Sequence, residues 1–427
     1  MTSKEKTFFV AVALFLIVGN LPRFIPLTIG FGNVNMGEVI LYILTAILFP
    51  ARVFRVMKSA IGRVLITGTA MSLAIGIYKW GADLSSASYA IRFIIQISIS
   101  AIIGETIARE YGKDISTPLQ KYFLAYFIIA LAALALLAAF PDSAVLWAAL
   151  ASIGVEFTGD PHIGRLISLY FDPNFYAVIV TLPISLLYAD YAEKRKTKTL
   201  IFFLILTGTI LLTVSRSGIA LLFMIAMFFG GKGFIRSIYT LKIKKTTARN
   251  FVLMLAALAI VIVASQDQVD RLIQRLSSGV GDDSSTARYD SFVIGMDLFF
   301  KEPLLGFGYN FLNPFLAESN RLGLDSSLQV LFVTYGALLS MGMITLICWH
   351  GYKINRRIMI SIKSSGPKEN KSFNKTWSIF RCYVILCLVW ASHFNQIIFY
   401  PFWIIPILSM LFYFEFIGLK NRRYMVN

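Results

Sequence analysis

The chain has 427 residues, of which 57% are hydrophobic and 15% are charged, a balance that soluble globular proteins do not have. The formal net charge of +17 does not indicate nucleic-acid binding, because the basic residues lie in short segments between apolar runs. These runs have the length that bilayer-spanning helices require. Composition therefore predicts an all-α, polytopic integral membrane protein.

The apolar runs predict about twelve membrane-spanning helices within one membrane domain, residues 1–427. The first run follows a charged segment, Met1 to Lys6, and no small-residue cleavage site follows it, so we interpret it as an uncleaved span. The spans are expected to begin near Phe8, Val39, Val64, Ala90, Tyr122, Phe175, Leu200, Gly218, Phe251, Gln329, Ile379 and Phe402.

The Lys and Arg residues predict the orientation of these spans. Every basic cluster follows an even-numbered span, which by the positive-inside rule places these segments and both termini in the cytoplasm. The clusters are Arg52 to Arg63, Arg109 to Lys121, Lys194 to Lys198, Lys232 to Arg249, Lys353 to Lys375, and Lys420 to Arg423.

Two longer segments fall on the opposite, outer side of the predicted membrane. One covers about residues 141–170 and the other about residues 265–324. The second contains two helix-forming stretches, Gln268 to Leu276 and Ala287 to Phe300. Because a loop of this length is usually functional or disordered, and this one is partly apolar, we expect a large helical loop that packs on the membrane face.

Arg216, in Ser215-Arg216-Ser217-Gly218, is the most informative residue. Basic clusters flank residues 200–231, so the chain must cross and return within this segment. Each leg then reaches roughly 23 Å, less than the roughly 30 Å hydrocarbon core, and Arg216 is expected to be recessed below the outer surface. An arginine there costs about 2.5–3.5 kcal/mol on insertion scales, which favours a functional role. The alternative is an arginine that snorkels to the interface.

Three further arginines lie toward the outer side. Arg288 begins an amphipathic stretch with an apolar stripe, and the alternative for it is an interfacial helix with a snorkelling arginine. Arg92 lies near the outer end of the fourth span, where snorkelling is again an alternative, and Arg165 lies in the first outer segment. Arginine suits bidentate phosphate contact, so recessed outer arginines suggest a lipid-linked phosphate or pyrophosphate.

Two acidic positions precede spans. Asp325, followed by Ser326 and Ser327, could accept a proton from a sugar hydroxyl or could cap the tenth span. Asp172 lies in the turn Asp172-Pro173-Asn174 before the sixth span, and the alternative to a functional role for it is an ordinary helix cap.

No nucleotide-binding motif and no cofactor or metal site is predicted. The sequence has no Walker A motif, dinucleotide fingerprint, Asp-x-Asp pair or metal-ligand spacing. The three cysteines, Cys348, Cys382 and Cys387, are interpreted as small buried hydrophobic residues.

Four short pieces between about Arg165 and Leu339 resemble the O-antigen ligase and polymerase superfamily, which are glycosyltransferases of the bacterial inner membrane. Each piece is weak alone, but their order, the topology and the large outer loop are together fairly specific. The pieces are Asp172-Pro173-Asn174, Ser215-Arg216-Ser217-Gly218, Arg288 with Pro303-Leu304-Leu305-Gly306-Phe307-Gly308, and Asp325-Ser326 leading to Gly336.

The resemblance implies a donor glycan on undecaprenyl pyrophosphate and an active site that faces the periplasm. Arg216 and Arg288 match the family's conserved arginines and would hold the pyrophosphate, with Arg92 and Arg165 as further candidates. Transfer would invert the anomeric centre without a metal. Membrane lipids and a chain-length regulator protein are the partners that this implies, and nucleic acid is not one.

One departure from the family pattern bears on the activity. The ligases carry His where this chain has Asp325, and the position three beyond Gly336 is Leu339 instead of a small residue or Tyr. Asp325 would be a weaker base than His unless burial raised its pKa. The resemblance therefore favours a repeat-unit polymerase, with an O-antigen ligase acting on lipid A–core as the alternative. A lipid-linked oligosaccharide flippase is a third hypothesis, but a long structured outer loop does not suit alternating access.

Overall fold

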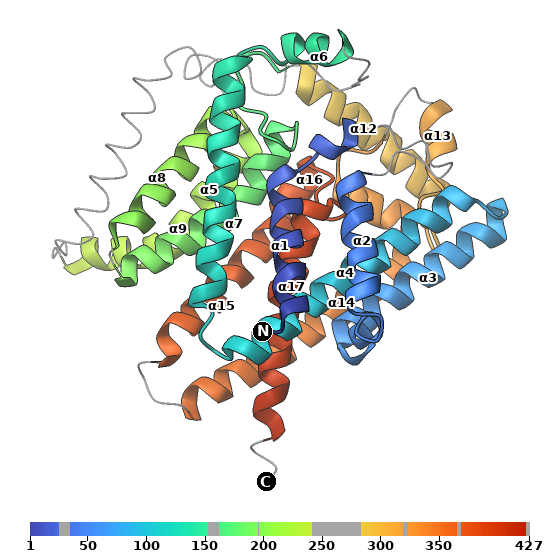
Figure 1. Cartoon of the computed structure of the whole chain (residues 1–427). Helices are drawn as coiled ribbons and strands as arrows, with labels where there is room; N and C mark the ends of the chain where they lie inside the picture. Colours follow the sequence, from blue (N-terminus) through green and yellow to red (C-terminus); the bar gives the residue numbers. More distant parts are fainter. Residues whose placement is uncertain are drawn as a thin grey trace.

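The computed structural model describes residues 1–24, 35–152, 162–194, 196–240, 283–318, 323–364 and 369–423. Within these ranges the secondary structure is helical apart from one isolated antiparallel bridge, Asp142 to Ile163 (Figure 1). The helices are α1 Ser3–Val18, η1 Leu21–Phe24, α2 Met36–Leu48, η2 Val53–Lys58, α3 Ala60–Trp80, α4 Leu84–Tyr111, α5 Ser116–Ala139, α6 Ser143–Ser152, α7 Pro173–Lys194, α8 Thr197–Leu212, α9 Arg216–Thr240, α12 Asp283–Lys301, α13 Asn313–Glu318, α14 Ser327–Ser364, α15 Glu369–Leu386, η3 Cys387–Ala391, α16 Ser392–Phe394 and α17 Pro401–Arg423.

Six stretches of helix are long and apolar enough to cross a membrane: Ala60–Trp80, Leu84–Tyr111, Ser116–Ala139, Ser327–Ile360, Phe373–Phe394 and Pro401–Leu419. The prediction of a helical membrane protein is confirmed at this level. All the predicted span starts fall within described helices, apart from the one near Phe251, which lies outside the described residues. The number twelve and the orientation stay predictions.

The two predicted outer segments contain short and amphipathic helices. α6 lies in the segment 141–170, and α12 and α13 lie in the segment 265–324. α12 covers the predicted helix from Ala287 to Phe300, whereas Gln268 to Leu276 lies outside the described residues. α6 and α12 lie at the same end of the bundle, above the ends of the longer helices (Figure 1).

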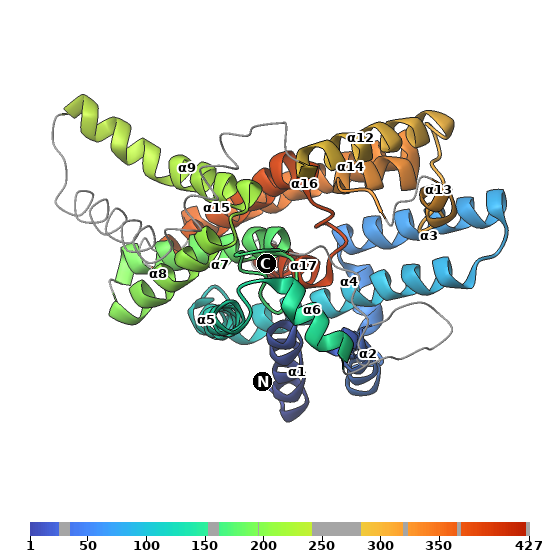
Figure 2. The same cartoon turned by 90° about the horizontal axis from the view of Figure 1, so that it is seen from above.

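Helices α4 and α17 pack closely against each other, and together with α7 they are the most buried long helices among the described residues. Buried residues make up 67% of the most apolar window of α4 and 78% of that of α17, against 33% for α3 and α5. Small residues permit this close packing, since a Cβ on Gly104 would lie 2.7 Å from Ser409 O and Tyr413 N. Seen from above, α7, α8 and α9 lie on one side of α17, and α3, α12 and α14 on the other (Figure 2).

α14 is interrupted at Gly336, where φ is 67° and ψ is 171°. The interruption removes backbone hydrogen bonds within the helix, and the loop between α12 and α13 replaces them. The inter-segment bonds run from Phe307 N to Val333 O, Gly308 N to Thr334 O, Ala337 N to Pro303 O and Leu338 N to Leu304 O, at 2.8–3.1 Å. Two motif pieces that are about thirty positions apart in the sequence are thereby joined.

Gly336 and Gly306 allow this joint because neither has a Cβ. A Cβ on Gly336 would lie 2.4 Å from both Gly306 N and Leu304 O, and a Cβ on Gly306 would lie 2.4 Å from Gly336 N. The φ and ψ of Gly336 also belong to a region that is essentially restricted to glycine.

We expect Gly336→Ala to lower the free energy of unfolding by about 3 kcal/mol or more, because it adds backbone strain to a steric clash. Gly342→Ala is the matched control in the same helix, since a Cβ there meets nothing within 4 Å. Thermal unfolding of the purified protein in detergent measures both. Equal melting temperatures for the two variants would contradict this account of the joint.

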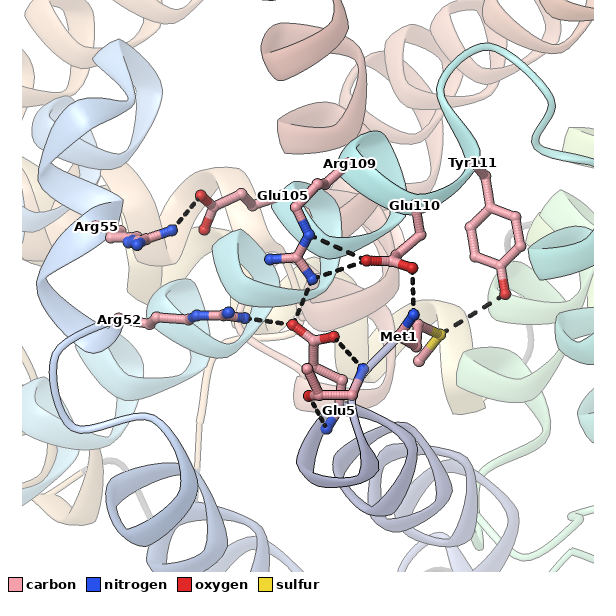
Figure 3. Close-up of polar contacts among 9 residues, drawn as sticks. Met1, Glu5, Arg52, Arg55, Glu105, Arg109, Glu110 and Tyr111 are labelled. Carbon is pink, nitrogen blue, oxygen red and sulfur yellow. Dashed lines mark hydrogen bonds and ion pairs between the residues drawn. The ribbon is translucent and has the colours of Figure 1, made fainter.

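A group of ion pairs ties α1 to α4 and to the turn before η2 (Figure 3). Glu5, only 1% exposed, accepts from Arg52 Nη1 at 2.7 Å and from Arg109 Nη2 at 2.5 Å. Glu110 pairs with Arg109 and with the amino group of Met1. Burial raises the pKa of Glu5, but the hydrogen bonds from Arg109 and Arg52 outweigh it and bring the pKa to about 2.

Because the pKa of Glu5 falls on folding, its contribution to stability is complete above the unfolded pKa and is lost as the pH falls through about 2. Glu5→Gln is therefore expected to cost about 1–3 kcal/mol at neutral pH. The difference in melting temperature between the variant and wild type should narrow when both are measured near pH 3. A difference that is the same at both pH values would show that the charge of Glu5 is not the cause.

Candidate functional site

Arg165 joins two of the motif segments that the sequence singled out. It is 8% exposed. Its Nε donates to Thr213 O at 2.9 Å, in the turn before Arg216, and its Nη2 donates to Asn174 Oδ1 at 3.1 Å. His162 Nδ1 lies 3.4 Å from Nη1. The Asp172-Pro173-Asn174 turn and the α8–α9 turn are thus held together by one buried guanidinium.

Asp172 caps α7, which is the role that the sequence offered as the alternative to a functional one. Its Oδ1 accepts from the backbone N–H groups of Asn174 at 2.6 Å and Phe175 at 2.9 Å. Burial raises the pKa of Asp172, while these N–H groups and the charges of Arg165 and Arg288 lower it, with a net rise. Arg288 of α12 and Arg165 therefore both lie close enough to act on the same carboxylate.

The turn between α8 and α9 places Arg216 as the first residue of α9. Val214 has a positive φ of 52°, a conformation that β-branched residues rarely adopt and that concentrates at functional sites. Ser215, at the N-cap position of α9, accepts from Gly218 N at 3.4 Å and lies 3.3 Å from Ser217 Oγ. The turn predicted from the flanking basic clusters is present, with Arg216 half-buried on it.

Asn395, which sequence reasoning did not select, connects this turn to α14. Its Nδ2 donates to Ser217 Oγ at 3.2 Å, and its backbone O accepts from Ser327 Oγ at 2.7 Å. It follows the π-helical turn η3 and the short helix α16, a type of break that is frequent at functional sites. The signal in the sequence is the polar run Ser392 to Gln396 inside an apolar span.

Asp325 stands one residue before the N-cap of α14. The cap itself is Ser326, whose Oγ accepts from Gln329 N at 3.4 Å and donates to Ser392 O at 3.1 Å. The backbone N–H of Asp325 donates to Ser291 Oγ on α12 at 3.0 Å. The capping role that was one alternative for Asp325 is therefore filled by Ser326, and Asp325 is a half-buried carboxylate between α12 and α14.

These contacts define a polar cluster at which the N-termini of α7, α9 and α14 converge. Helix N-termini carry partial positive charge and unpaired N–H groups, so their convergence favours an anion. Its members come from the four motif segments and from the break at Asn395: Arg165, Asp172, Asn174, Ser215, Arg216, Ser217, Arg288, Ser291, Asp325, Ser326, Ser327 and Asn395.

Two predicted site residues lie outside this cluster. Gly336 forms the joint with Gly306 described above. Arg92 of α4 forms a bidentate ion pair with Glu38 of α2, with Nε to Oε2 and Nη2 to Oε1 both at 2.5 Å. This ion pair joins α4 to α2.

A cavity of about 450 Å³ lies beside the polar cluster. Its lining includes Phe175, Leu324 and Gln396, which are the immediate sequence neighbours of Asn174, Asp325 and Asn395. This volume is within the range of about 300–1,000 Å³ that is typical of small-molecule sites. The cluster and the cavity therefore share a wall.

Metal ligands do not gather in the part of the chain that the structure describes: no group of three or more His, Cys, Asp or Glu side chains there could hold an ion. Cys382 and Cys387 are buried free thiols, and Cys348 is exposed. What the described residues of the cluster offer chemically is a set of guanidinium groups, helix N-termini and the carboxylates of Asp172 and Asp325.

Comparison with known proteins does not identify a family. No family model matches the sequence, and no curated protein shows significant similarity to it.

Asn395→Ala is expected to reduce activity at the cluster and to cost about 1–3 kcal/mol of stability, because Ser217 loses its buried hydrogen-bond donor. Gln120→Ala is the control, since Gln120 is an exposed carboxamide on α5 and does not line the cavity. Melting temperature measures the stability, and the cellular glycan assay described below measures the activity. If the Asn395→Ala protein had wild-type stability and activity, the hydrogen bond from Asn395 to Ser217 would contribute to neither.

Proposed function

We propose that the protein is a polysaccharide repeat-unit polymerase of the O-antigen type, located in a bacterial inner membrane with its active site facing the periplasm. The observation that carries the proposal is the polar cluster, in which the four motif segments that resemble this superfamily meet through hydrogen bonds and shared electrostatics. This convergence supports a shared role for the four segments.

The donor is an oligosaccharide on undecaprenyl pyrophosphate, and the acceptor is a second lipid-linked repeat. Arg216 and Arg288, together with the N-termini of α7, α9 and α14, provide positive charge for a pyrophosphate. Arg165 holds the Asp172-Pro173-Asn174 turn against the α8–α9 turn, and its positive charge lies at the same cluster. Fixed positive groups of this kind stabilise the negative charge that develops on a leaving group.

The transfer step follows from these positions. An acceptor hydroxyl attacks the anomeric carbon of the donor sugar, the bond from that carbon to the pyrophosphate oxygen breaks, and the electron pair leaves with the lipid pyrophosphate. Asp325 takes the hydroxyl proton, because it stands at the position where the ligases that this chain resembles carry His and lies beside the N-terminus of α14 in the cluster. Attack from the face opposite the leaving group inverts the configuration.

Asp325 also bears on the alternative activity. A ligase of this superfamily would be expected to carry His at this position, so the carboxylate favours the polymerase over transfer to lipid A–core. A chain-length regulator protein and membrane lipids are the partners that such a polymerase would have.

We expect Arg216→Ala and Arg288→Ala each to reduce chain extension by about 100-fold or more, the scale seen when one preorganised charge-stabilising donor is removed. Asp325→Asn should lose extension as well, because it has no base. Lys301→Ala is the matched control on α12, since Lys301 is 58% exposed and its ion pair is with Asp297 in the same helix. Gel profiles of surface glycans from a deletion strain carrying each variant give the readout.

The same gel distinguishes the activities. Collapse of the ladder to core plus one repeat unit in the deletion strain is the result expected of a polymerase. Loss of all repeats from the core, with long chains still on the carrier lipid, would show a ligase instead. Failure of the repeat to reach the outer face would show a flippase, and unchanged ladders in the arginine variants would refute the pyrophosphate site.

A further inference from the structure

The described residues that line the cavity beside the polar cluster carry no net charge. Among the described residues that line it, the charged ones are Glu38 and Arg92, which close on each other as a bidentate pair. Tyr42 also donates to Glu38 at 2.6 Å. With the guanidinium and the carboxylate both engaged, the described lining residues do not offer the surplus positive charge that a phosphate would need.

The rest of the lining combines carboxamides with aromatic rings. Asn310, Asn313 and Gln396 contribute carboxamide groups from one side. Tyr309, Phe93 and Phe399 form an aromatic wall, with ring centroids 5.8–6.4 Å apart. Carboxamides both donate and accept hydrogen bonds, and aromatic rings offer apolar faces, so the lining suits a ligand that has hydroxyl groups around an apolar ring face.

Asn310 carries an unmet hydrogen-bond donor. Its Nδ2 atom is buried and has no hydrogen-bond partner, although its backbone O accepts from Ser86 Oγ at 3.0 Å. Its φ of 63° is left-handed, a conformation that fixes the position of the side chain at a small cost for Asn. A buried polar atom without a partner costs free energy. Nδ2 is shielded from solvent in this structure, so a ligand accepts its hydrogen bond, and recovers that free energy, once the Asn310 carboxamide rotates toward the cavity that this residue lines.

From these observations we propose that the cavity is a binding site for a neutral saccharide unit, with Asn310, Asn313 and Gln396 contacting hydroxyl groups and Tyr309, Phe93 and Phe399 packing on a sugar ring. It lies beside the charged cluster, so sugar and pyrophosphate occupy separate regions. Arg92 then serves to neutralise Glu38 and to shape the cavity. As a subsite for the glycan of a polymerase substrate, this inference rests on the proposed function, whereas saccharide binding in itself does not.

Saccharide binding can be measured directly on the full-length protein in lipid nanodiscs. The probes are galactose, mannose, N-acetylglucosamine and rhamnose, observed by saturation-transfer difference NMR, with galactose 1-phosphate and N-acetylglucosamine 1-phosphate for comparison. We expect at least one neutral sugar to bind, and tighter binding of its 1-phosphate would reflect contact of the phosphate with the neighbouring charged cluster. No signal from any neutral sugar, including the case in which only the 1-phosphates bind, would overturn the proposal.

Asn310→Gly is the decisive variant, because glycine accepts the left-handed φ and removes the unpartnered donor. It is expected to keep the wild-type melting temperature and to weaken sugar binding by at least about fivefold, the loss of one hydrogen bond. Gln396→Ala is a second variant with the same expectation. Asp297→Asn, on the exposed face of α12, should bind as wild type does. Wild-type binding by both Asn310→Gly and Gln396→Ala would overturn the proposal.

Failure of this inference can be told from failure of the proposed function. If deletion of the gene collapses the glycan ladder but both cavity variants bind sugar as wild type does, the saccharide site is refuted and the polymerase stands. If sugar binding depends on Asn310 but deletion leaves the ladder unchanged, the saccharide site stands and the polymerase is refuted.

Discussion

Buried helix breaks control the arrangement of this protein, because each break leaves backbone N–H and C=O groups that an apolar environment cannot satisfy. The turn before α9, the start of α14 and the break between η3 and α17 all lie next to one another. Serine hydroxyls and Asn395 supply the missing partners. The same groups that make the breaks tolerable also fix where α7, α9 and α14 begin.

Convergence of these helix N-termini has an electrostatic consequence. Each N-terminus adds partial positive charge, and Arg165 and Arg288 act on the region of the Asp172 carboxylate. Because the groups are held by hydrogen bonds from several elements, little reorganisation is needed when an anion arrives. This is the property that makes a charge-stabilising site effective in catalysis.

The neighbouring cavity differs from the cluster in the chemistry of its described lining. Its charged residues neutralise each other, and its remaining polar groups are carboxamides and hydroxyls. A charged region and a neutral region that share a wall match a substrate with an anionic leaving group and an uncharged glycan. The joint between Gly306 and Gly336 supports both the charged cluster and the cavity, because it fixes the loop that carries Tyr309 and Asn310 against α14.

The sequence alone determined the helical membrane class, the turn at Arg216 and the helix from Ala287 to Phe300, because hydrophobic run length, charge position and helical periodicity are local properties. It also selected Arg165, Asp172 and Asp325, since charged side chains beside apolar spans are few. Only the tertiary structure decided which of them meet. Ser217 and Asn395 are 178 positions apart, and Glu38 and Arg92 are 54 apart. Pairings at such distances depend on how whole helices pack, so neither the role of Asn395 nor the neutralisation of Arg92 could be predicted from residue type and spacing.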